Sequence, residues 1–163
     1  MNTGKSKPYA ILVFGAPKSG KTSFAEHFSQ TINAPFLNLT HLVNEYHVSK
    51  KLAEELINQI SKSRSTLIIE GNIDTEAQRK EMREMLVKFG YQPVIVWVQT
   101  DLNTIKQRMR ASYRTLSEAK DALSKALSHI EAPADDEKTI VISGKHTYQT
   151  QCRNVVNRLT DAN

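Results

Sequence analysis

The sequence has a single cysteine, Cys152, among its 163 residues. One cysteine excludes an intramolecular disulfide and a zinc site built from several thiolates, and it fits a reducing compartment. No apolar run approaches the roughly 20 residues that a membrane-spanning helix needs. The five histidines do not have the spacing of metal ligands; they are His27, His41, His47, His129 and His146. We therefore expect a cytoplasmic protein with no membrane partner and no zinc.

Internal repeats, low-complexity tracts and linkers are also lacking. A chain of 163 residues is about the size of one domain. We expect a flexible tail over residues 1–8 and a single domain over residues 9–163. The formal charge of +5 favours polyanionic ligands, but it does not choose between nucleotides, nucleic acid and membrane surfaces.

Short apolar runs alternate with segments of helical periodicity along the whole chain. The runs predict strands at residues 10–14, 35–39, 66–70, 93–98 and 139–143. They are nearly continuous rather than alternating, as expected of parallel strands covered on both faces. The helical stripes are Phe24, Phe28 and Ile32; Leu52, Leu56 and Ile60; Met82, Met85, Leu86 and Phe89; and Leu116, Leu123, Leu127 and Ile130. This order predicts a three-layer α/β domain with helices on both faces of a parallel sheet.

Local signals also predict where helices begin and end. Asp74 and Asp101 each precede a periodic segment and are typical of helix starts, while Gly90 is typical of a helix stop. Ligands of such folds bind at the carboxyl ends of the strands. The functional face is therefore predictable from the order of the elements.

The first predicted strand runs into a glycine-bearing turn that matches G-x-x-x-x-G-K-[ST], the phosphate-binding loop. Its residues are Gly15, Ala16, Pro17, Lys18, Ser19, Gly20, Lys21 and Thr22. The two glycines permit close backbone approaches, so that successive N–H groups point at phosphate oxygens. Lys21 places an ammonium on the β and γ phosphates, Thr22 offers a hydroxyl to Mg²⁺, and the helix that follows adds its positive dipole end. A chain of this length matches the pattern by accident roughly one time in two hundred.

With this loop in place, the chain resembles the small P-loop kinases, which include nucleoside monophosphate, shikimate and gluconate kinases, polynucleotide 5′-kinases and zeta-toxin-like kinases. The resemblance extends through TLIIEGN at residues 66–72 and through residues 94–114, which are similar to a strand, a polar turn and a helix leading to lid arginines. It implies a P-loop NTPase fold with strand order 2-3-1-4-5, ATP and Mg²⁺ as cofactors, and a short lid around residues 108–135.

Beyond the loop, the candidates for the catalytic site are Glu70, Arg108 and Arg114. Glu70 ends a buried strand beside the loop and can hold Mg²⁺ together with Thr22, although a carboxylate there can also merely cap a turn. Arg108 and Arg114 match the lid spacing of the related kinases, and guanidinium groups suit phosphate oxygens. Together with Lys21, these arginines are the predicted catalytic residues, provided that the helix continues through residue 114; Arg110 then lies on another side of it.

The acceptor is not resolved by the sequence. Kinases that phosphorylate a hydroxyl usually have an aspartate after the second strand, but residues 28–73 contain none, and His41 or Glu45 are substitutes at best. Nucleotide monophosphate kinases usually clamp their acceptor with an arginine, but residues 23–63 contain none; Lys50 and Lys51 could compensate.

Two weaker candidates and two functions stay open. Asn72 and Arg79 could contact an acceptor, but a solvated helix arginine is equally consistent with the pattern. The favoured function is an ATP-dependent phosphotransferase acting on a nucleotide, a nucleic-acid end or another small molecule. The alternative is a P-loop protein that binds or hydrolyses nucleotide as a switch, although the guanine-reading N-K-x-D and the transporter-type L-S-G-G-Q are missing. Nucleic acid is a possible partner without a specific signal, and the preferred triphosphate and oligomeric state are open.

Overall fold

The computed structural model of the chain describes residues 7–161. Most of the tail expected over residues 1–8 lies outside this range. The strands are β1 (Tyr9–Phe14), β2 (Phe36–Asn38), β3 (Leu67–Glu70), β4 (Gln92–Gln99) and β5 (Thr139–Ser143). The helices are α1 (Lys21–Ile32), α2 (Leu39–Tyr46), α3 (Lys50–Ser61), α4 (Glu76–Lys88), α5 (Leu102–Arg110), α6 (Leu116–Leu127) and α7 (Tyr148–Thr160).

The five strands form one parallel sheet in the order β2-β3-β1-β4-β5, which confirms the predicted topology. β1 is central, and its Leu12 lies between Ile69 of β3 and Ile95 of β4. The strand order reverses beside β1, so the crevice at its carboxyl end is the natural ligand site of the fold. The phosphate-loop motif begins at this point.

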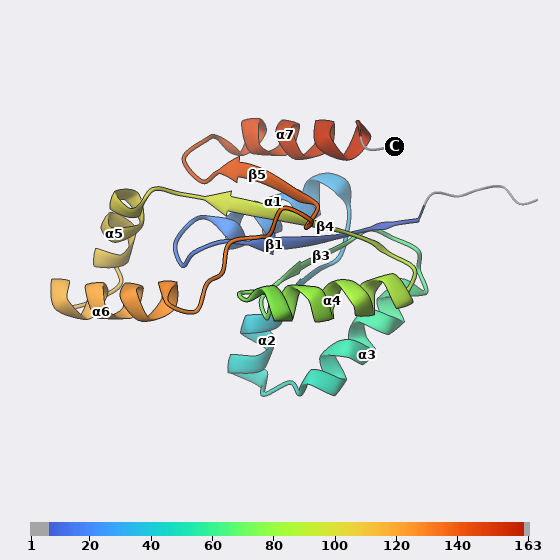
Figure 1. Cartoon of the computed structure of the whole chain (residues 1–163), viewed down its shortest axis with the longest axis horizontal. Coiled ribbons are helices and arrows are strands. Elements are labelled where there is room, and N and C mark those ends of the chain that lie inside the picture. The colour runs from blue at the N-terminus through green and yellow to red at the C-terminus, as the bar shows by residue number, and fades with distance from the viewer. Residues whose placement is uncertain (1–6, 162–163) are drawn as a thin grey trace, which may run out of the picture.

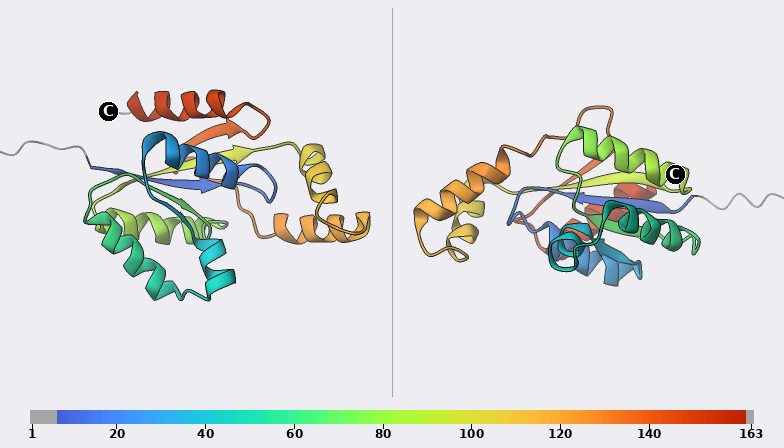
Figure 2. Two further views of the ribbon diagram at one scale, coloured as in Figure 1. Left: turned by 180° about the vertical axis from the view of Figure 1, so that it is seen from behind. Right: turned by 90° about the horizontal axis from the view of Figure 1, so that it is seen from below.

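Helices cover both faces of the sheet, as expected (Figures 1 and 2). Ile11 and Val13 of β1 pack with the buried residues of α1 and α7 on one face. Leu12 and Phe14 pack with α3 and α4 on the other face. Because every β1 side chain from residue 10 onward is buried, the strand reads as a continuous apolar run.

α5 and α6 form a helix pair at the carboxyl end of the sheet, at one end of the molecule in Figure 1. A small separate core of Ile105, Met109, Ala119 and Leu123 holds the two helices together. We call this pair the lid helices. Nowhere in residues 7–161 is a helix long and apolar enough to cross a membrane.

The expected helix through residue 114 is wrong, because α5 ends at Arg110 with Ala111 as its C-cap. Ser112 N–H donates to Met109 O in a turn, and a new helix begins after Thr115. Thr115 and Glu118 form a reciprocal capping box, in which each side chain accepts a hydrogen bond from the other residue's backbone N–H. Residues 111–115 therefore separate two helices instead of extending one.

The start of α4 also differs from the prediction by one residue. Thr75, not Asp74, is the N-cap, and Thr75 forms a capping box with Gln78. A threonine hydroxyl that accepts the N3 N–H satisfies the helix end, so the Asp74 carboxylate is not used for capping. At the other end, α4 stops at Lys88, and Gly90 adopts the left-handed conformation with φ 90°, as the predicted stop requires.

Candidate functional site

The phosphate-binding loop connects β1 to α1 at the crevice. A Cβ atom on Gly15 would lie 2.6 Å from the carbonyl oxygen of Val98, so only glycine fits against the end of β4. Gly20 has φ 102° and is the N-cap of α1, a conformation that favours glycine. Both glycines of the motif are therefore explained by the backbone of the loop.

The remaining loop residues surround the start of α1. Ala16 and Pro17 line cavities, the Lys18 side chain is exposed, and Ser19 is buried with a hydroxyl oxygen that has no hydrogen-bond partner. Lys21 Nζ donates to Ala16 O at 3.4 Å, a long contact that folds the ammonium back over the loop. The loop thus gathers backbone N–H groups, one ammonium and the positive end of α1.

Thr22 and Glu70 meet beside this loop, as the sequence predicted for a magnesium site. Thr22 Oγ1 donates a hydrogen bond to Glu70 Oε1 at 2.8 Å. Glu70 is only 4% exposed, and its Oε2 has no hydrogen-bond partner. Burial raises the pKa of the Glu70 carboxyl, although the Thr22 hydroxyl and the Lys21 ammonium oppose this shift.

The unpartnered Oε2 of Glu70 makes the pair suitable for a cation. A buried carboxylate oxygen without a partner is costly, and a hard divalent cation would remove that cost. A hydroxyl and a carboxylate are oxygen donors of the type that Mg²⁺ prefers. The donor set therefore fits Mg²⁺.

A cavity of about 300 Å³ lies between the loop and the end of β3. We call it the transfer cavity. Lys21, Glu70 and Asp74 line it, together with Thr40 at the start of α2 and His129 after α6. Asp74 is a candidate that the sequence analysis placed only as a helix start. The signal that could have found it is its position four residues after Glu70, at the carboxyl end of a strand next to β1.

The two predicted lid arginines occupy different settings. Arg108 Nη1 donates to Lys18 O at 2.9 Å, and its Nη2 donates to Gly144 O at 3.2 Å. Its guanidinium therefore joins the phosphate loop to the turn after β5. Arg114 is exposed in the turn between the lid helices, beyond the end of α5. The structure brings Arg108 to the loop but does not bring Arg114 there.

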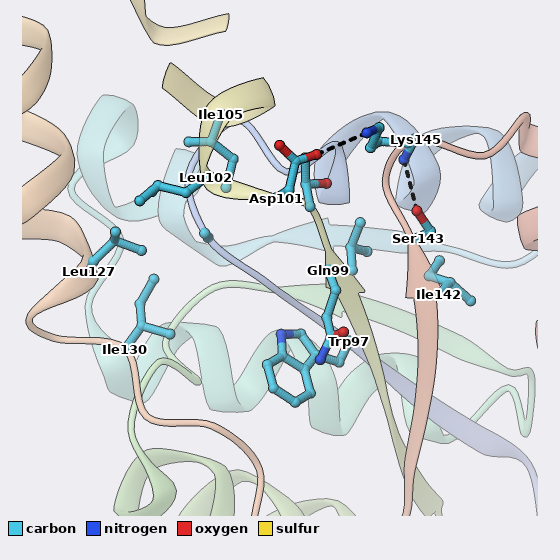
Figure 3. Close-up of a pocket in the computed structure, with 13 residues that line it drawn as sticks. Trp97, Gln99, Asp101, Leu102, Ile105, Leu127, Ile130, Ile142, Ser143 and Lys145 are labelled. Atoms are coloured by element: carbon cyan, nitrogen blue, oxygen red, sulfur yellow. Dashed lines mark hydrogen bonds and ion pairs between the residues drawn. The ribbon is translucent and has the colours of Figure 1, made fainter. Parts of the chain in front are cut away.

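A second cavity, of about 680 Å³, separates the lid helices from the ends of β4 and β5 (Figure 3). Leu127 and Ile130 face Trp97 across it, so Trp97 is half-buried rather than enclosed in the core. At its mouth, Lys145 Nζ forms an ion pair with Asp101 Oδ2 at 3.1 Å. Hydrogen bonds from Thr104 and Lys145 hold the pKa of Asp101 well below its usual range. Because the cavity lies between them and the strand ends, the lid helices are not tightly packed onto the sheet.

Arg79 is neither a solvated helix residue nor a lining residue of the transfer cavity. Its side chain is fully buried, 4.9 Å above the Phe14 ring, and its Nε donates to Glu137 Oε1 at 3.0 Å. Its Nη1 also donates to the carbonyl oxygens of Asp74 and Glu131 at 3.2 and 2.8 Å. Arg79 therefore fixes the backbone at Asp74 against the segment that follows α6.

The proposed substitutes for a catalytic base lie elsewhere. His41 and Glu45 are exposed on α2, and neither lines the cavities described for this part of the chain. Lys50 forms an ion pair with Glu81 of α4, Lys51 is exposed, and Asn72 lines a hollow beside α4. The geometry favours Asp74 over these residues, because Asp74 lines the same cavity as Lys21 and they do not.

A family model described as an AAA domain matches residues 11–134, from β1 to beyond the lid helices. The chain belongs to this AAA domain family. The match includes the whole phosphate loop, Glu70 and Asp74. No curated protein sequence matches the chain.

Solved structures with low sequence identity share the fold of this AAA domain. A gluconokinase from Sinorhizobium meliloti 1021 is 17% identical with a TM-score of 0.69, over 97% of this chain and 95% of that chain. Kti12 of Chaetomium thermophilum, in complex with ADP-AlF3, is 17% identical with a TM-score of 0.68, over 94% and 98%. The Mycobacterium tuberculosis APS kinase CysC, in complex with AMPPNP and APS, is 15% identical with a TM-score of 0.67, over 96% and 99%. These likenesses confirm the small P-loop kinase-like fold.

Proposed function

We propose that this AAA domain is an ATP-dependent phosphotransferase that acts on a hydroxyl group. The observation that carries the proposal is the transfer cavity, because Lys21, Glu70 and Asp74 line one hollow beside the phosphate loop. An ammonium for the transferred phosphoryl group, a carboxylate for the metal and a carboxylate for the acceptor proton are the groups that phosphoryl transfer requires.

Each group has a separate task in the proposed reaction. The loop and Lys21 bind the triphosphate, and Thr22 with Glu70 would hold Mg²⁺, which neutralises charge on the phosphates when bound. The acceptor oxygen forms a bond to the γ-phosphorus while the bond from that phosphorus to the β–γ bridging oxygen breaks. Asp74 accepts the hydroxyl proton, and ADP leaves with the bridging oxygen.

The lid supplies the remaining positive charge in this proposal. Arg108 already contacts the phosphate loop, and the cavity beneath the lid helices leaves them room to approach the strand ends. Closure would bring Arg114 nearer to the phosphates and would exclude water. Kinases and nucleotide complexes among the structures that share the fold support nucleotide binding and transfer.

Replacement of Lys21 tests the proposal directly. Lys21→Ala should lower phosphoryl transfer by about 100-fold or more, because it removes a preorganised charge from the transition state. Lys80→Ala, which removes an exposed lysine from α4, is the matched control. The measurement is ADP release and phosphorylated product across a panel of alcohol acceptors, with far-UV circular dichroism to verify folding. Transfer within threefold of the unmodified protein in folded Lys21→Ala would refute the proposal.

The alternative function is nucleotide hydrolysis without transfer. It is favoured by one observation, the lack of an arginine among the residues that line the transfer cavity. ADP release that no acceptor accelerates, with no phosphorylated product, would select this alternative. Acceptor-dependent release that Asp74→Asn reduces more than the control Asp136→Asn would select the kinase.

A further inference from the structure

A third hollow, of about 670 Å³, lies between the α2–α3 pair and α4. We call it the side groove. Leu39 and Asn72 line it, and the residues next to them in the chain, Thr40 and Gly71, line the transfer cavity. The two hollows therefore adjoin at the carboxyl ends of β2 and β3, on either side of the contact between Thr40 and Gly71. A molecule with one end in the transfer cavity passes over this contact to extend along α4.

The floor of the side groove is apolar. Val43, Ile57, Met82 and Phe89 contribute to it, from α2, α3 and the length of α4. Methionine side chains are flexible and adapt to ligands of varied shape. The floor therefore suits an apolar portion of a ligand rather than a fully polar one.

The charged side chains of the groove leave a negative excess. Its lining contains three glutamates, Glu54, Glu81 and Glu84, against two lysines, Lys50 and Lys88, and none of the lining residues described is an arginine. Two of these charges already pair, because Lys50 Nζ donates to Glu81 Oε1. The hydrogen bond that Lys50 donates to Glu81 is the largest cause that raises the pKa of Lys50. The negative charges of Glu81 and Glu54 raise this pKa further.

The second lysine, Lys88, is included in this balance, which leaves one carboxylate in excess. Lys88 follows Glu84 by four residues on α4, a spacing at which the two side chains are neighbours. Asp74, which lines the transfer cavity, adds a further carboxylate. An anionic acceptor would need a guanidinium fork or a free ammonium cluster, and the groove provides neither.

We propose that the phosphoryl acceptor is a cationic alcohol with an apolar body, that is, an amino alcohol. Its hydroxyl lies in the transfer cavity beside Asp74, its hydrocarbon part lies on the floor of the side groove, and its ammonium lies near Glu54 and Glu84. This inference rests on the proposed phosphotransferase function and names the substrate class for it. The hydroxyl loses its proton to Asp74 and gains the γ-phosphoryl group, so the products are a phosphate ester and ADP.

Three probes that differ only in charge test the substrate class. They are 6-aminohexan-1-ol, hexane-1,6-diol and 6-hydroxyhexanoate, each supplied with ATP and Mg²⁺ to the full chain. We expect kcat/KM to be about tenfold higher for the amine than for the diol, because the groove carboxylates attract the ammonium. For the carboxylate probe, kcat/KM should be lower than for the diol, because the same groups repel it. Equal values for amine and diol, or a preference for the carboxylate, would overturn the proposal.

Variants of the two glutamates locate the preference in the groove. The double variant Glu54→Gln, Glu84→Gln should reduce the amine-to-diol ratio of kcat/KM to about one. Glu55→Gln, on the same helix but outside the groove lining, should keep the tenfold ratio. An amine preference that survives the double variant would show that the groove does not select the acceptor.

Binding separates this inference from the proposed function. Titration calorimetry with the same three probes, in the presence of a non-hydrolysable ATP analogue, reports charge selection even if no phosphate is transferred. Amine-selective binding without product would refute the phosphotransferase but retain the groove. Product formed from an anionic acceptor would support the phosphotransferase and overturn the substrate class.

Discussion

Glu70 and Glu137 are both glutamates with 4% exposure, but their surroundings differ completely. Glu137 accepts hydrogen bonds from the Arg79 guanidinium and from Ala134 N–H, and Arg83 Nη1 lies 3.6 Å from Glu137 Oε1. Burial alone would raise its pKa, but these partners outweigh burial and lower the pKa of the Glu137 carboxyl. Glu70 has one hydroxyl donor and one oxygen without a partner, and burial raises the pKa of its carboxyl.

The difference distinguishes a structural carboxylate, Glu137, from Glu70, which we propose to be the functional carboxylate. The Arg79–Glu137 pair satisfies itself and joins α4 to the segment before β5, so it needs no ligand. Glu70 lies at the phosphate loop with one carboxylate oxygen that has no hydrogen-bond partner. Perturbed and incompletely partnered groups of this kind mark functional sites. The predictions below test this distinction.

The largest expected effect is on stability, at the structural carboxylate. Arg79→Met leaves the Glu137 charge buried without its main partner, so the free energy of unfolding should fall by about 3–5 kcal/mol. Urea unfolding followed by circular dichroism measures this change. Arg83→Met, which removes only the outer contact, should cost clearly less. The double variant Arg79→Met, Glu137→Leu should recover much of the loss, and an equally large loss in the double variant would contradict the ion-pair explanation.

The second effect is on catalysis, at the functional carboxylate. Glu70→Gln should reduce kcat by about 100-fold, because the proposed metal site loses its charge while nucleotide contacts through the loop persist. In EDTA, the same variant should melt a few degrees higher than the unmodified protein, since it removes a buried charge and about 1 kcal/mol shifts Tm by 2–4 °C at this chain length. A lower Tm together with unchanged kcat would reverse the assigned roles.

Acidification should distinguish the structural carboxylate in a third way. Its pKa is lowered in the folded state, so it contributes stability that is present above its ordinary value of 4.5 and is lost as pH falls through the folded pKa. Glu137→Gln should therefore be clearly less stable than the unmodified protein at pH 7, and the difference should shrink as pH decreases below about 4.5. Unfolding free energies across this range are the measurement. A difference that does not change with pH would exclude the charge as its cause.

The smallest effect concerns the lid arginines. Arg108→Lys keeps the charge but loses the fork that now spans Lys18 O and Gly144 O, so kcat should fall by about tenfold, and Arg108→Ala should be worse. Arg114→Lys and Arg114→Ala should show the same ranking if the lid closes. Arg110→Lys, at the exposed end of α5, is the control. Steady-state kcat and the Kd for ATP are the measurements. A loss of kcat in the Arg110 variant alone would show that the lid is arranged differently.

The loop and the strands could be predicted because their signals lie among residues that are close together in the chain. The β1 run, the glycines and Lys21–Thr22 predicted a phosphate loop because backbone conformation and helix start are local properties. The Thr115–Glu118 capping box was equally local, and it could have located the break after Arg110 that the sequence analysis missed. The helix start was assigned to Asp74 instead of Thr75, because both residue types are typical N-caps. Only the capping box of Thr75 with Gln78 distinguishes the two positions.

The sequence by itself determined the order of elements, the phosphate loop and, through the resemblance, the sheet order 2-3-1-4-5. Only the tertiary structure decided that Arg79 pairs with Glu137, 58 residues away, and that Asp74 faces the same cavity as Lys21. The physical reason is that charge partners and cavity walls form between segments that are far apart in the chain. Short-range periodicity carries no information about which of the 17 acidic residues a buried arginine will meet.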